Sequence, residues 1–129
     1  MSLLKSGDSI LLDFDGELTD IEGLSFPTIG KLRPGMKEFL IECDKAKIKV
    51  WIWSARGNYH PDFPSNLQSM EGLMAIRAFM RMNNLPHAGI YTGHKPIGDA
   101  SGQFRFLLDD KARHFNTGYA AISELLTGD

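Results

Sequence analysis

The sequence has a single cysteine, no long apolar run and no large excess of charge of either sign. Cys43 therefore has no partner within the chain for a disulfide. No apolar stretch approaches the roughly 20 residues that span a bilayer, and the segment from Met1 to Ile10 is too polar for a signal peptide. These absences predict a reducing, cytoplasmic setting with no membrane partner.

Several common site patterns are also missing. The 14 Lys plus Arg nearly balance the 16 Asp plus Glu, so no strong basic field attracts nucleic acid. The histidines form no His-x-x-x-His pair and no Cys-x-x-Cys occurs, which argues against a zinc site. The glycine-rich runs of dinucleotide and P-loop nucleotide sites are absent as well.

The composition is that of one globular domain. The 129 residues, of which 43% are apolar and 23% charged, have the usual size and make-up of a single unit. No repeat or low-complexity tract divides them. A chain of this size buries roughly two thirds of its unfolded surface, which is enough for a core without metal or disulfides. We therefore expect one domain over residues 1–129.

Short apolar runs alternate with helical patterns along the chain. Runs at residues 9–13, 49–54 and 104–109 are rich in branched or aromatic residues, as buried parallel strands are, and a weaker strand is predicted at 88–92. A helix is predicted after Pro34, with one buried face consisting of Met36, Phe39, Leu40 and Cys43. Further helices are predicted over 69–83 and 118–126. This alternation predicts a parallel α/β sheet with right-handed crossovers.

Polar residues follow the predicted strands and are expected to converge, because ligands bind beyond the carboxyl ends of such strands. The expected cluster consists of Asp13, Asp15, Ser54, Lys95, Asp109 and Asp110. Carboxylates gathered at one edge repel one another unless a cation neutralises them. Ligation by oxygen alone suits Mg²⁺, which commonly accompanies phosphate.

A hydroxyl and an ammonium beside such a cluster are what phosphoryl transfer needs, and Ser54 and Lys95 provide them. One aspartate attacks phosphorus, while a second donates a proton to the leaving alcohol and then activates water. A spacing of two residues places Asp13 and Asp15 on the same side of an extended chain. Gly16 lets the backbone turn away directly after them.

Four segments resemble, in order, the motifs of the haloacid dehalogenase-like superfamily of phosphatases. The segment from Asp13 to Asp20 resembles the first motif, and Trp53-Ser54-Ala55-Arg56 resembles the second. Lys95-Pro96 resembles the third, and Leu107-Leu108-Asp109-Asp110 resembles the fourth. Each motif is weak alone, but four in order over about residues 9–110 are specific. The resemblance implies a three-layer Rossmann-like fold with a central parallel sheet.

The resemblance also implies roles for the carboxylates. Asp13 would be the nucleophile and a metal ligand, and Asp15 the general acid and base, which also offers its backbone carbonyl to Mg²⁺. Asp109 would be the other protein ligand, and Asp110 would support the metal or its waters. An aspartate at position 15 favours phosphatase chemistry, because the dehalogenase and P-type ATPase branches lack a carboxylate there.

For phosphate, the resemblance implies binding by Ser54, Ala55 and Lys95, with Lys95 bridging phosphate and nucleophile. The residues expected to border the substrate are Glu17, Arg56, Tyr59 and His60. The intervals between motifs are short, which resembles members without a cap domain. Their open site suits a macromolecular substrate or is closed by a neighbouring subunit. Glu17 departs from the small or β-branched residue common at that position.

Two other functions stay open at this point. A receiver-like signalling module shares the acidic Mg²⁺ pocket. A receiver would have its acidic pair on the first strand and its phosphate-accepting aspartate on a later one, whereas here Asp-x-Asp-Gly comes first and the pair of aspartates last. A non-catalytic interaction domain is the second alternative, with the methionine-rich helix over 69–83 as an adaptable partner surface. The phosphorylated substrate is open among sugar phosphates, nucleotides, phosphoprotein and nucleic acid 3′-phosphates, and so is assembly into a homo-oligomer.

Overall fold

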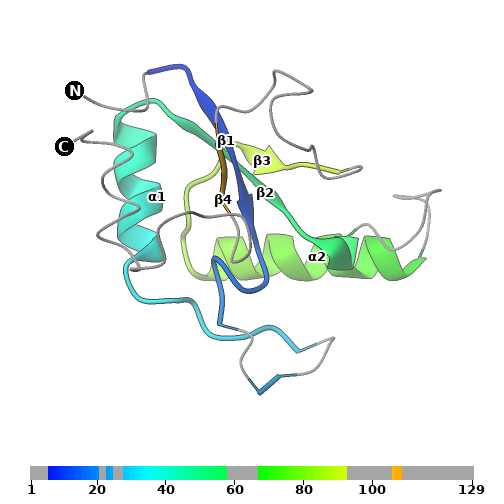
Figure 1. Ribbon diagram of the computed structural model, residues 1–129. Coiled ribbons are helices and arrows are strands. Elements are labelled where there is room, and N and C mark those ends of the chain that lie inside the picture. Colours follow the sequence, from blue (N-terminus) through cyan, green and yellow to red (C-terminus); the bar gives the residue numbers. More distant parts are fainter. Residues whose placement is uncertain (1–5, 21–22, 25–27, 58–66, 93–105, 109–129) are drawn as a thin grey trace.

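The structure is a computed structural model that describes residues 6–20, 23–24, 28–57, 67–92 and 106–108. Its centre is a four-stranded parallel sheet in the order β3-β2-β1-β4 (Figure 1). The strands are β1 (Ser9–Asp13), β2 (Lys49–Trp53), β3 (Gly89–Ile90) and β4 (Phe106–Leu108). The predicted parallel α/β sheet is thereby confirmed.

The sheet is built on continuous apolar segments. Ile10, Leu11 and Leu12 of β1 are all fully buried, as expected for a central strand covered on both faces. In β2, Val50 and Ile52 are buried, and they alternate with the half-buried Trp51 and Trp53. β1 and β2 run in register from one end to the other, so that their carboxyl ends reach the same edge of the sheet.

Helix α1 (Met36–Lys45) begins after Gly35, which adopts the left-handed conformation with φ 86°. Its buried residues are the four that the sequence pattern predicts, Met36, Phe39, Leu40 and Cys43. Helix α2 (Leu67–Met82) matches the predicted helix over 69–83 within two residues at each end. The helix predicted over 118–126 lies outside the described residues.

Both described helices pack against one face of the sheet. Phe39 and Leu40 of α1 and Ile76 and Met80 of α2 share a core with side chains of β1 and β2. Phe14, directly after β1, packs edge-on against Phe79 of α2, with ring centroids 5.3 Å apart. The strand order explains why the two helices share a face. Going from β1 to β2 and from β2 to β3, the chain moves across the sheet in the same direction each time. Right-handed crossovers in one direction place both helices on the same side of the sheet. Among the described residues, no helix is long and apolar enough to cross a membrane.

The buried thiol of Cys43 is expected to be inert in the folded protein. Burial, with the nearby charge of Glu42, raises its pKa from 9.0 to about 12. Because only the thiolate reacts with iodoacetamide, we expect negligible alkylation at pH 8 in buffer and rapid alkylation in denaturant. Intact-mass measurement at timed intervals checks this. Alkylation at the same rate with and without denaturant would contradict the buried position of Cys43.

Candidate active site

The first two strands deliver polar residues to the same edge of the sheet. Asp13 is the last residue of β1 and pairs in register with Trp53, the last residue of β2. The amide of Phe14 donates to the carbonyl of Trp53 at 2.8 Å, which extends the pairing by one step. Ser54 comes next along the chain and is buried. The expected convergence of the first and second motifs is therefore present.

A tight turn follows Asp13 and holds Asp15 at this edge. Gly16 has φ 93°, a conformation that side chains disfavour, and its amide donates to the carbonyl of Thr19 at 3.0 Å. The amide and the hydroxyl of Thr19 both donate back to the carbonyl of Phe14, at 3.0 and 3.2 Å. Arg33 also stabilises the turn, because its Nη1 donates to the carbonyl of Gly16 at 3.0 Å. The backbone on either side of Asp15 is thus fixed by hydrogen bonds.

Three hydrogen bonds converge on the carboxylate of Asp15. Ser54 Oγ donates to Oδ2 at 2.8 Å, and Arg56 Nε donates to the same oxygen at 2.9 Å. Arg56 Nη2 donates to Oδ1 at 2.7 Å, which makes the ion pair bidentate. The side chain of Arg56 is 6% exposed and that of Asp15 is 25% exposed. Bidentate charge-assisted pairs of this kind fix orientation as well as charge.

Arg56 is itself held from several directions. It lies in the short 3-10 helix η1 (Ala55–Gly57), and its amide donates to Ser54 Oγ at 3.2 Å. Its Nη2 also donates to the carbonyl of Thr28 at 3.2 Å, and its guanidinium carbon lies 5.9 Å from the centre of the Phe14 ring. These contacts leave the guanidinium little freedom to turn away from Asp15.

Helix α2 packs directly on the segment that carries Arg56. At Gly72 the helix backbone approaches η1 so closely that a methyl group would overlap the carbonyl oxygen of Arg56. Glycine at this position permits the contact because it has no Cβ. The position of Arg56 therefore depends on how α2 is seated on the sheet.

The other predicted site residues divide into two groups. Ala55 is exposed at the start of η1, whereas Glu17, which belongs to the turn after Asp15, is completely buried. Glu17 and Arg56, which were both expected to border the substrate, are thus buried in this structure. The remaining predicted residues are outside the described ranges, namely Tyr59, His60, Lys95, Asp109 and Asp110. β4 ends at Leu108, which pairs with Leu12 of β1, one residue before Asp13.

The described part of this edge offers oxygen ligands and no sulfur or imidazole. A carboxylate comes from Asp13, and a backbone carbonyl from Asp15, whose side-chain oxygens both accept hydrogen bonds. This donor chemistry fits a hard cation such as Mg²⁺. No group of three or more His, Cys, Asp or Glu residues suited to a metal occurs within the described residues. The Mg²⁺ site that the sequence predicts would also need Asp109, which lies outside those ranges.

Sequence reasoning did not predict that Arg56 would contact Asp15. The available signal was the position of Arg56 two residues after Ser54 at the end of a strand, since Ser54 was itself expected beside Asp15. A chain that turns directly after the strand keeps both side chains near the same edge. That turn depends on η1, which the residue pattern did not predict.

Comparison with known proteins shows the fold and no function. No family model matches the chain, and no curated protein matches it. A conserved protein from Bacteroides thetaiotaomicron has a similar structure, with a TM-score of 0.54 and 20% identity over 91% of this chain and 87% of that one. A target protein from Vibrio cholerae is similar with a TM-score of 0.55 and 21% identity, over 94% of this chain and 98% of that one.

Proposed function

We propose that the protein is a Mg²⁺-dependent phosphomonoesterase of the haloacid dehalogenase-like superfamily, with that family's three-layer Rossmann-like fold and no cap domain. The observation that carries the proposal is the carboxylate of Asp15, which is fixed by Ser54 and Arg56 two residues after Asp13. An ion pair that only stabilises the fold does not require a second carboxylate two residues earlier, at the end of β1. A general acid and base that works beside a nucleophile does require one.

The first half of the reaction forms a bond between Asp13 and phosphorus. A carboxylate oxygen of Asp13 attacks the phosphorus atom while the bond from phosphorus to the leaving oxygen breaks, and Asp15 in its acid form gives that oxygen a proton. Arg56 donates to both oxygens of Asp15 and so holds the carboxyl group in place during this transfer.

The second half of the reaction regenerates Asp13. Asp15, now a carboxylate, takes a proton from water as the water oxygen attacks phosphorus, and the bond to Asp13 breaks. Arg56 keeps Asp15 in one place through both steps, so that the same carboxyl group serves the leaving group and the water. Mg²⁺, when bound, supplies positive charge against the phosphate oxygens and the carboxylate of Asp13.

Phosphate binding is proposed for Ser54, the backbone at Ala55, and Lys95. In this structure the hydroxyl of Ser54 donates to Asp15, so it must turn from Asp15 in order to donate to a phosphate oxygen. Arg56 still holds Asp15 through two contacts after that exchange. The proposed substrate is a phosphorylated molecule, small or macromolecular, met in the cytoplasm.

A panel of phosphate esters tests the proposal. Sugar phosphates, nucleotides, phosphopeptides and oligonucleotides with a 3′-phosphate are each incubated with the full chain, with Mg²⁺ or with EDTA. We expect release of inorganic phosphate from at least one class, with Mg²⁺ only. Stable phosphorylation without turnover would instead support the receiver-like module, and no reaction with any class would contradict the phosphatase.

A further inference from the structure

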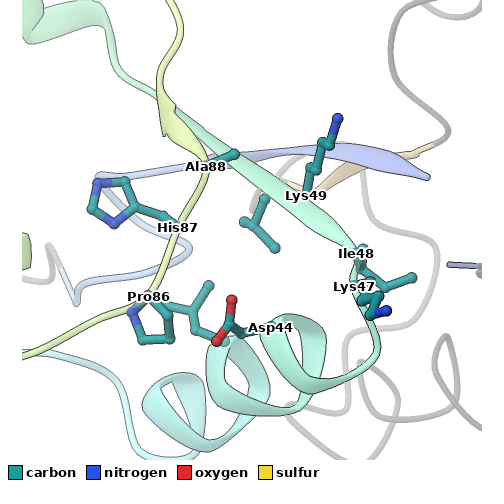
Figure 2. Close-up of a pocket in the computed structure, with 9 residues that line it drawn as sticks. Asp44, Lys47, Ile48, Lys49, Pro86, His87 and Ala88 are labelled. Atoms are coloured by element: carbon teal, nitrogen blue, oxygen red, sulfur yellow. The ribbon is translucent and has the colours of Figure 1, made fainter. Parts of the chain in front are cut away.

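Two adjoining hollows lie at the edge of the sheet opposite the candidate active site. The first, of about 250 Å³, lies between the end of α1, the start of β2 and the segment before β3 (Figure 2). The second, of about 540 Å³, lies between α1 and the carboxyl-terminal half of α2. Both are lined by Pro86 and His87, and we call them together the paired hollows. Ser54 is four residues beyond Val50 along β2, roughly 13 Å away, so this surface is separate from Asp15.

The floor of the paired hollows is apolar. Ile41, Met80 and Leu85 line the larger hollow, and Leu40, Ile48 and Val50 line the smaller one. Most of these side chains belong to the buried core, so the hollows expose its edge to solvent. Hollows of this kind accept apolar side chains because filling them removes apolar surface from water.

The walls of the paired hollows are cationic, although the whole chain has a net charge of −2. Arg77 and Arg81 line the larger hollow, and Lys47 and Lys49 line the smaller one. Asp44 is the single acidic residue among the described lining residues, and Figure 2 shows it on α1 at the smaller hollow. Four cationic side chains against one anionic side chain favour an anionic occupant.

A stripe on the outer face of α2 continues this surface. It consists of Met70, Met74, Arg77 and Arg81, whose spacings of four, three and four residues place them on one side of the helix. Met70 is 46% exposed and Met74 is 65% exposed, whereas Met80 of the same helix is buried in the core. Exposed methionines adapt to apolar partners of varied shape. The stripe therefore combines apolar and cationic contacts, as the hollows do.

We propose that the paired hollows and the α2 stripe bind an acidic amphipathic segment of a partner protein. Its apolar side chains fill the floor and cover Met70 and Met74, and its carboxylates pair with Arg77 and Arg81. Nucleic acid fits less well, because the described lining residues include no Phe, Tyr or Trp ring for a base to stack on. A floor of aliphatic side chains also offers nothing to phosphate groups.

The probe for the test is a fluorescein-labelled peptide of about 14 residues, or roughly four helical turns, with leucines on one face and glutamates on the other. Matched peptides replace the leucines with serine or the glutamates with lysine, and a single-stranded oligonucleotide of equal charge is the polyanion control. Fluorescence anisotropy with the full chain should show saturable binding of the first peptide alone, weakening as salt rises. Amide shifts in an NMR titration should map to Arg77, Arg81 and Lys49.

Variants locate the binding surface. Arg77→Glu with Arg81→Glu should weaken binding of the acidic peptide by about tenfold or more, and Met74→Ser should weaken it without changing the salt dependence. Lys31→Glu, which reverses one exposed charge on the loop before α1, is the matched control for Arg81→Glu alone and should leave the affinity unchanged. The proposal is overturned by unchanged affinity in the double variant, by equal binding of the oligonucleotide, or by no saturable binding of the peptide. Phosphatase activity plays no part in these readouts.

Discussion

Replacing Asp13 with asparagine is expected to lower Mg²⁺-dependent phosphate release by about 10⁴-fold or more, because an amide cannot attack phosphorus. The substitution keeps the shape of the side chain at the end of β1, so the fold should be retained. Phosphate release from the best ester of the panel is measured at saturating substrate, with circular dichroism as a check on folding. Acid-quenched protein should also no longer retain radiolabelled phosphate.

A matched control separates loss of the nucleophile from loss of any surface carboxylate. Asp44→Asn makes the same chemical change at an exposed position at the end of α1, beside the smaller of the paired hollows, and should leave turnover unchanged. If the Asp13 variant released phosphate at the rate of the unmodified protein, the covalent route through Asp13 would be wrong. If both variants lost activity alike, a general effect of charge would account for the result.

Removal of Arg56 is expected to have the second-largest effect, and one that depends on the leaving group. Arg56→Ala deletes two of the three hydrogen bonds that hold Asp15, and a displacement of about 1 Å can cost about 10²-fold in rate. An alkyl phosphate needs a proton on its leaving oxygen, whereas p-nitrophenyl phosphate scarcely does. We therefore expect kcat to fall about 10²-fold with the alkyl ester and far less with p-nitrophenyl phosphate.

Two further measurements show whether Arg56 acts through Asp15. Guanidinium ion at low millimolar concentration should restore part of the alkyl ester rate in Arg56→Ala, because it can occupy the vacated position. Arg56→Lys retains the charge but not the bidentate geometry, so its rate with the alkyl ester should lie between those of the unmodified protein and Arg56→Ala. Asp15→Asn should show the same selective loss with the alkyl ester, and adding Arg56→Ala to it should cost little more.

Stability must be measured alongside these rates. Deleting one partner of a largely buried ion pair typically costs about 3 kcal/mol, so assays belong well below the melting temperature of each variant. A uniform loss across both esters, without rescue by guanidinium, would show that Arg56 only supports the fold. The role of Arg56 as a positioning residue would then be wrong, whereas the phosphatase proposal would stand.

Much of the fold was predictable because its signals are local. The runs at 9–13 and 49–54 have uninterrupted apolar centres, at 10–12 and 50–53, and a central parallel strand is the structure that covers such a run on both faces. The buried face of α1 followed from helical spacing alone. Parallel pairing then placed the residues after β1 and β2 at one edge, as expected.

Helix α2 shows both what local pattern predicts and where it stops. Four of its residues are methionines, and helical spacing places only Met80 on one apolar stripe with Leu73, Ile76 and Phe79. The structure buries Met80 and exposes Met70, Met74 and Met82. The contact of α2 with η1 at Gly72, by contrast, joins two segments that no helical spacing relates.

The amino-acid sequence by itself determined the strands, the buried face of α1 and the arrival of Asp13 and Ser54 at one edge. These follow from periodicity and from the geometry of parallel pairing, which act over a few residues at a time. Only the tertiary structure decided that Asp15 pairs with Arg56, a residue 41 positions away. That contact exists because η1 turns the chain back and α2 packs on it without an intervening side chain, and no local pattern encodes such a packing.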